Sequence, residues 1–136
     1  VDMLAQQVDS LHDLMGRADI IVVTVPGGGS NTGLIDAAAL AAMKPNGIFV
    51  NIARGDVVDE DVLIAALQKR QIAGAGLDVF AKEPIVPDAL RALENVVILP
   101  HLGTAALEVR EAMGQMALDN IIAWDEGRAL PQGLTS

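Results

Sequence analysis

The sequence contains no cysteine and only two histidines, His12 and His101, among its 136 residues. The absence of cysteine excludes disulfides, thiolate metal ligands and cysteine nucleophiles. Two histidines far apart in the sequence also disfavour a zinc site. We therefore expect no metal centre in this chain.

Basic and aromatic residues are scarce as well. Lys and Arg total 9 against 18 Asp and Glu, which gives a net charge of -9, and the aromatic residues are two Phe and one Trp. Nucleic-acid binding requires a basic surface, and binding to single strands also uses aromatic stacking. The composition therefore predicts no nucleic-acid partner.

Long apolar runs are missing too. Runs such as residues 20–23 are far shorter than the roughly 20 residues that span a bilayer, and the first residues lack the basic and apolar regions of a signal peptide. We expect a soluble, cytoplasmic protein with no membrane partner. The chain opens on Val1 rather than methionine, and we expect it to be part of a longer protein.

Four short apolar runs, three of them rich in β-branched residues, are the strongest structural signal. They are nearly continuous rather than alternating, which is typical of strands buried on both faces of a parallel sheet. The runs are residues 20–25, 48–52, 73–77 and 96–99.

Helical segments separate these runs, and each begins at a residue suited to capping. Ser10 caps a short helix that ends at Gly16, Asp36 caps residues 37–43, and Asp59 caps residues 60–70 with Lys69 and Arg70 in the last turn. A longer helix follows at residues 107–126. The alternation predicts an α/β fold, the second half of a doubly wound, Rossmann-like parallel sheet with helices on both faces and a long C-terminal helix.

Several charged side chains follow the predicted strands. Ligands of open parallel sheets bind outside the carboxyl ends of the strands, and this edge collects Arg54, Asp78, Glu83 and His101. A guanidinium binds a carboxylate, a histidine moves a proton, and a carboxylate orients that histidine. This set is suited to reducing a carbonyl beside a carboxylate, and the hydride would require a nicotinamide cofactor.

Each of these residues also has a structural interpretation. Arg54, Gly55 and Asp56 are compatible with a solvated turn containing a local ion pair, and Asp78 with a turn or cap residue. Glu83 is compatible with an exposed loop carboxylate and His101 with a structural histidine. Residues 27–29 are all glycine but lack the lysine and spacing of a phosphate loop, so we interpret them as a flexible loop beside the site.

A series of short motifs follows in order along nearly the whole chain. They are Val25-Pro26, Thr32-Gly33-Leu34-Ile35, Met43-Lys44-Pro45-Asn46-Gly47, Asn51-Ile52-Ala53-Arg54-Gly55, Val58-Asp59, Gly76-Leu77-Asp78-Val79-Phe80, Glu83-Pro84, Asn95-Val96 and Pro100-His101-Leu102-Gly103-Thr104-Ala105. This series resembles the D-isomer-specific 2-hydroxyacid dehydrogenases. The resemblance implies that Arg54 grips the substrate carboxylate and carbonyl, that His101 is the acid/base, and that Glu83 pairs with that histidine.

The same resemblance implies NAD or NADP as cofactor. It implies that Asp78 holds the nicotinamide carboxamide, and that Pro26, Ala53 and Gly103, with Arg54 and His101, line the nicotinamide side. The glyoxylate and hydroxypyruvate reductases are the most similar branch, and the intact protein is expected to be a homodimer.

The chain departs from the family in lacking both the G-x-G-x-x-G turn and the residue that selects NAD or NADP. We therefore expect residues 1–126 to be a partial NAD(P)-binding domain and residues 127–136 a tail leading toward a substrate domain. Such a chain should be inactive by itself. Two other interpretations remain open, a cofactor-sensing module like the corepressors that share this fold and an inert structural half-domain.

Overall fold

The computed structural model describes residues 5–133 of the chain. The chain divides into two compact units, with the boundary between Pro100 and His101. The first contains the parallel sheet and the second contains the long helix. Each unit is described by itself below.

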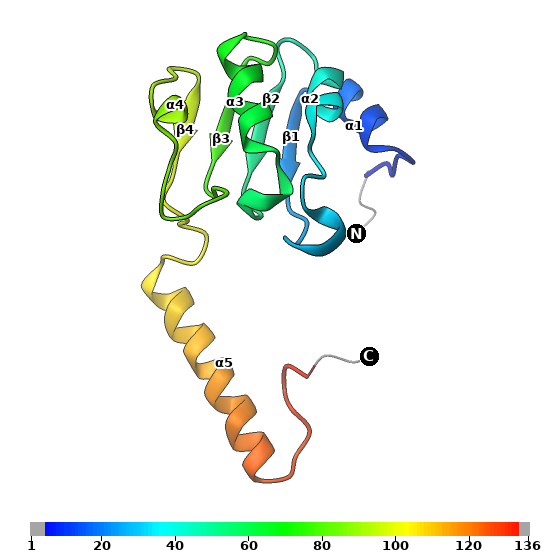
Figure 1. Ribbon diagram of the computed structural model, residues 1–136. Helices are drawn as coiled ribbons and strands as arrows, with labels where there is room; N and C mark the ends of the chain where they lie inside the picture. Colours follow the sequence, from blue (N-terminus) through cyan, green and yellow to red (C-terminus); the bar gives the residue numbers. More distant parts are fainter. Residues whose placement is uncertain (1–4, 134–136) are drawn as a thin grey trace. The chain divides into compact units, whose positions relative to one another are not determined.

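The first unit is built on a four-stranded parallel sheet (Figure 1). Its strands lie in the order β1-β2-β3-β4, so strands that are consecutive in sequence are also neighbours in the sheet. This arrangement confirms the predicted α/β fold and brings the carboxyl ends of all four strands to one edge. The strands are β1 (Ile20–Val23), β2 (Ile48–Asn51), β3 (Gly74–Leu77) and β4 (Val96–Ile98).

The three predicted helix caps of this unit are confirmed. The backbone N–H of Asp13 donates to Ser10 Oγ at 3.0 Å, that of Ala39 donates to the Asp36 carboxylate at 2.9 Å, and that of Val62 donates to the Asp59 carboxylate at 3.2 Å. Each cap satisfies one of the free N–H groups of a first helical turn. The helices are α1 (Leu11–Arg17), α2 (Ala37–Ala42), α3 (Glu60–Gln68) and α4 (Asp88–Arg91), and the 3-10 turns are η1 (Gly29–Asn31) and η2 (Gly55–Val57).

Several predicted boundaries were wrong. Helix α1 continues through Gly16 to Arg17, and the chain leaves the helix at Ala18. Helix α3 ends at Gln68, so Lys69 and Arg70 lie beyond its last turn, and Arg70 takes a left-handed φ of 53°. Strand β1 ends at Val23, two residues before the end of the apolar run.

Burial of the sheet also differs from the prediction. In β1 and β2, buried residues alternate with more exposed ones, so Ile21, Val23 and Phe49 are buried while Ile20 and Val22 are 61% and 51% exposed. Strand β3, which lies between β2 and β4, is mostly buried. The core lies on one face, where α1 to α4 contribute apolar side chains to a single cluster. Within the described part of the first unit, residues 5–100, no helix contributes to a core on the opposite face of β1, whose side chains are exposed. The nearly continuous apolar runs of β1 and β2 therefore do not indicate strands buried on both faces of the sheet in this unit.

The second unit contains the predicted long helix, α5 (Leu107–Asp125). Its apolar residues are mostly exposed, including Met113 at 52%, Ile121 at 62% and Trp124 at 75%. Ala123 is its buried residue. No helix within residues 5–133 is both long enough and apolar enough to cross a bilayer.

Candidate functional site

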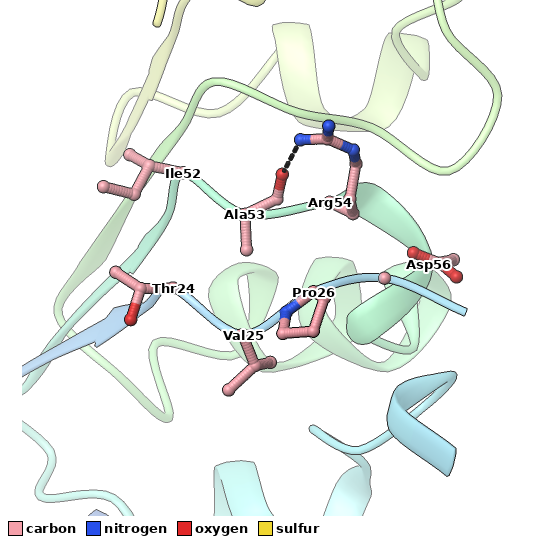
Figure 2. Close-up of a pocket in the computed structure, with 8 residues that line it drawn as sticks. Thr24, Val25, Pro26, Ile52, Ala53, Arg54 and Asp56 are labelled. Carbon is pink, nitrogen blue, oxygen red and sulfur yellow. Dashed lines mark hydrogen bonds between the residues drawn. The ribbon is translucent and has the colours of Figure 1, made fainter. Parts of the chain in front are cut away.

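A cleft opens at the carboxyl ends of β1 and β2. It has a volume of about 580 Å³, within the usual range for small-molecule sites. Figure 2 shows its two walls, one from the segment after β1 and the other from the segment after β2. The cleft is lined by Thr24, Val25, Pro26, Gly27, Ile52, Ala53, Arg54 and Asp56.

Backbone hydrogen bonds join these two walls outside the sheet itself. The N–H of Gly33 donates to the carbonyl of Asp56 at 2.8 Å, and that of Ile35 donates to the carbonyl of Val57 at 3.0 Å. The N–H of Asp59 donates in turn to the carbonyl of Ile35 at 3.0 Å. The loops after β1 and β2 are therefore tied together, and the cleft has a defined shape.

Arg54 is the cation of the cleft, and the end of β2 positions its backbone. The side chain of Asn51, 2% exposed, accepts from the N–H of Ala53 at 3.0 Å and donates to the carbonyl of Arg54 at 3.0 Å. One amide thus closes the turn by which the chain leaves the sheet. The Arg54 guanidinium donates to the carbonyl of Ala53 at 2.7 Å, as Figure 2 shows.

Gly55 holds this turn against the end of the third strand. A Cβ at this position would lie 2.0 Å from the carbonyl carbon of Phe80 and 2.4 Å from the nitrogen of Ala81. Neither backbone atom can move aside cheaply, so only glycine fits. The Arg54 turn and the segment after β3 are therefore packed backbone to backbone.

Asp78 and Glu83 lie in that segment after β3. Asp78 is 7% exposed, and its N–H donates to the carbonyl of Asn51 at 3.0 Å, beside the end of β2. Glu83 accepts from the N–H of Phe80 at 3.0 Å and precedes Pro84. Both residues make further interactions within the described chain.

His101 and Gly103 belong to the second unit. His101 adopts a φ of 53°, a left-handed conformation that is uncommon for residues other than glycine. His101 and Gly103 also have interaction partners. The cleft thus brings together Pro26, Ala53 and Arg54 from the predicted set, while Asp78 and Glu83 follow β3.

Two residues of the cleft region were not singled out by the sequence. Asn51 is a polar side chain at the last position of a buried strand, which is the signal that could have revealed it. For Asp56, the sequence suggests only a local ion pair with Arg54. That ion pair is absent from residues 5–133, because the Asp56 carboxylate instead accepts from the N–H of Gly28 at 2.8 Å.

The open parallel sheet and the cleft at its carboxyl edge define the chain as an open-sheet α/β domain, a class that binds ligands at this edge. Residues 1–103 match the family model described as D-isomer specific 2-hydroxyacid dehydrogenase, NAD binding domain. The chain belongs to this family.

Similar proteins include a curated relative and two solved structures. The chain is 42% identical over 128 residues to glyoxylate reductase from Pyrococcus furiosus, covering 94% of the chain and 38% of the relative. It is 43% identical, with a TM-score of 0.83, to the NADPH-dependent glyoxylate/hydroxypyruvate reductase from Sinorhizobium meliloti in complex with NADP and malonate, covering 85% of the chain and 36% of that structure. The holo form of D-mandelate dehydrogenase from Rhodotorula graminis has a TM-score of 0.90 at 38% identity, covering 95% and 38%.

The curated relatives are much longer than this chain. The chain spans between 36% and 39% of their length. The G-x-G-x-x-G turn that binds the pyrophosphate in such folds does not occur in the chain's sequence.

Proposed function

We propose that the protein is an NAD- or NADP-dependent oxidoreductase that transfers a hydride between the cofactor and a small 2-oxoacid or D-2-hydroxyacid, such as glyoxylate or hydroxypyruvate. The observation that carries the proposal is the exposed Arg54 guanidinium in a cleft at the carboxyl edge of the sheet. A guanidinium presents a planar pair of donors that matches a carboxylate.

The walls of the cleft suit a nicotinamide ring beside that carboxylate. Val25, Pro26 and Ala53 offer apolar surface, and the charged side chains that line the cleft are Arg54 and Asp56. We propose that Pro26, Ala53 and Gly103, with Arg54 and His101, line the nicotinamide side, and that Asp78 holds the carboxamide. The bound nicotinamide would supply or accept the hydride, which no protein side chain can do.

His101 and Glu83 complete the proposed chemistry. In reduction, His101 donates a proton to the oxygen of the forming hydroxyl group, and in oxidation it accepts that proton. Glu83 is proposed to orient the imidazole ring of His101. The left-handed backbone of His101 supports a functional role, because such conformations cluster at functional sites.

Two alternatives from the sequence receive less support. The relatives reported above are named as reductases and dehydrogenases. These names favour an enzyme over a cofactor-sensing corepressor module. The well-defined turn around Arg54 equally disfavours an inert half-domain, because a structural turn needs no exposed cation in a cleft.

We also propose the domain organisation, the cellular location and the oligomeric state that the sequence predicts. Residues 1–126 would form part of the cofactor domain and residues 127–136 would lead toward a substrate domain, which the family match over residues 1–103 supports. A cytoplasmic homodimer that binds neither nucleic acid nor membrane is consistent with the acidic, cysteine-free composition. Light scattering on the purified full-length protein tests the dimer.

Steady-state kinetics of the full-length protein test the activity. Glyoxylate, hydroxypyruvate and pyruvate are each supplied with NADH or NADPH, and D- and L-hydroxyacids are compared in the reverse direction. We expect reduction of at least one 2-oxoacid and oxidation of the D-isomer only. A folded full-length protein that reduces no 2-oxoacid with either cofactor, or that prefers the L-isomer, would contradict the proposal.

A further inference from the structure

The wall of the cleft after β1 is a loop with little stiffness of its own. Residues 27–29 are all glycine, and Gly28 and Gly29 have φ values of 77° and 56°. Glycine loses more conformational freedom on ordering than any other residue. A fixed shape for this loop therefore requires contacts from elsewhere in the protein.

Asp56 supplies such contacts from the opposite wall. Its Oδ2 atom accepts from the N–H of Gly28 at 2.8 Å and lies 3.3 Å from the hydroxyl of Thr32, which donates to it. A hydrogen bond to a carboxylate is shorter and stronger than one between neutral groups. One oxygen of Asp56 thus holds the loop at two points.

The held loop lies directly against Arg54. A Cβ on Gly27 would lie 2.8 Å from both Cβ and Cγ of Arg54 and 2.6 Å from Asp56 Oδ1. The loop backbone therefore packs on the stem of Arg54. Figure 2 shows the Arg54 guanidinium bonded to the carbonyl of Ala53, while the Asp56 carboxylate lies apart from that guanidinium.

We propose that Asp56 is a positioning residue for substrate selection, an inference that rests on the proposed function. By holding the glycine loop against Arg54, Asp56 keeps the cleft narrow beside the guanidinium and so favours 2-oxoacids with small side chains. Because its carboxylate is engaged by the loop, it also leaves the guanidinium available for the carboxylate of the substrate.

Kinetics of the full-length protein with two substrates test this role. Glyoxylate is compared with a branched 2-oxoacid, 2-oxoisovalerate, in the parent protein and in Asp56→Ala, Asp56→Asn and Ser30→Ala. Asp56→Ala should raise KM for glyoxylate about 10-fold, the effect expected for one charge-assisted hydrogen bond. It should also lower the ratio of kcat/KM for glyoxylate to that for 2-oxoisovalerate, while KM for the cofactor changes less than about twofold.

The other variants separate positioning from charge and from general stability. Asp56→Asn keeps an acceptor oxygen for Gly28, so its substrate ratio should lie between those of the parent and of Asp56→Ala. Ser30→Ala, an exposed change in the same loop, should behave as the parent. Thr32→Val removes only the weaker contact, so it should give a smaller shift in the same direction and serves if Asp56→Ala does not fold.

An unchanged substrate ratio in Asp56→Ala would overturn the inference, as would an Asp56→Asn ratio equal to that of Asp56→Ala. If Asp56→Ala does not fold, an unchanged ratio in Thr32→Val overturns it.

Hydrogen exchange over residues 27–33 tests the loop contact without any substrate. Faster exchange in Asp56→Ala supports the contact, and unchanged exchange refutes it. A parent protein that reduces no 2-oxoacid refutes the proposed function instead, and exchange then still decides whether Asp56 holds the loop.

Discussion

Asn51 offers the sharpest test of how the strand end positions Arg54. Its buried amide accepts from the N–H of Ala53 and donates to the carbonyl of Arg54, both at 3.0 Å. Asn51→Ala removes both hydrogen bonds without adding bulk. Among the described residues, no other side chain bonds the N–H of Ala53 or the carbonyl of Arg54.

The two lost bonds differ in cost. Ala53 is 7% exposed, so its N–H is left without a partner, at about 1–3 kcal/mol. Arg54 is exposed, so water can replace the bond to its carbonyl, and the net loss there is about 0.5–1.5 kcal/mol. We expect a total loss of about 2–4 kcal/mol in the free energy of unfolding.

Activity should fall further than stability alone would require. A displacement of about 1 Å in a substrate-positioning group costs on the order of 100-fold in rate. Unfolding by denaturant and kcat/KM for a 2-oxoacid should therefore both be measured on the full-length protein, at a temperature where the variant is folded. Asn46→Ala, an exposed turn residue, is the control, expected within about 0.5 kcal/mol of the parent. Asn51→Ala with parental stability and parental kcat/KM would refute the reasoning.

Three further predictions concern the same region. Gly55→Ala should abolish activity and lower the melting temperature strongly, since its Cβ would overlap the backbone of Phe80; a parental melting curve would contradict the packing. Arg54→Lys should lower kcat/KM for the 2-oxoacid by about 10- to 100-fold with little change in cofactor KM, because lysine lacks the planar pair of donors, and Arg17→Lys on the surface of α1 is the matched control. Glu83→Gln should lower kcat/KM for the 2-oxoacid, because a neutral amide oxygen is a weaker acceptor than a carboxylate for orienting the His101 ring. Parental kinetics in this variant would argue against the pairing with His101.

Much of the fold was predictable because its signals are local. Ser10, Asp36 and Asp59 cap the helices that follow them because each side chain bonds a backbone N–H three residues ahead. Three of the four apolar runs became strands because β-branched residues favour the extended backbone. Strand β3 contains no β-branched residue and is held by its pairing with β2 and β4. The helix ends were less predictable. Helix α1 runs past Gly16 to Arg17, and it packs on α2, a segment distant in the sequence.

The lining of the cleft was predictable in part, but its arrangement was not. The sequence alone placed Pro26, Ala53 and Arg54 just after two predicted strands, and all three line the cleft. It could not show that Asp56 bonds Gly28 rather than Arg54. Adjacent opposite charges suggest a local pair, whereas the actual partner lies 28 residues away.

The sequence by itself determined the alternation of strands and helices, the caps and the inventory of chemical groups, because these depend on residue type and short spacings. Only the tertiary structure decided which face of the sheet is buried, why position 55 must be glycine and what holds the glycine loop in place. Those features depend on distances between backbone segments far apart in sequence, and such distances exist only once β1, β2 and β3 have assembled side by side.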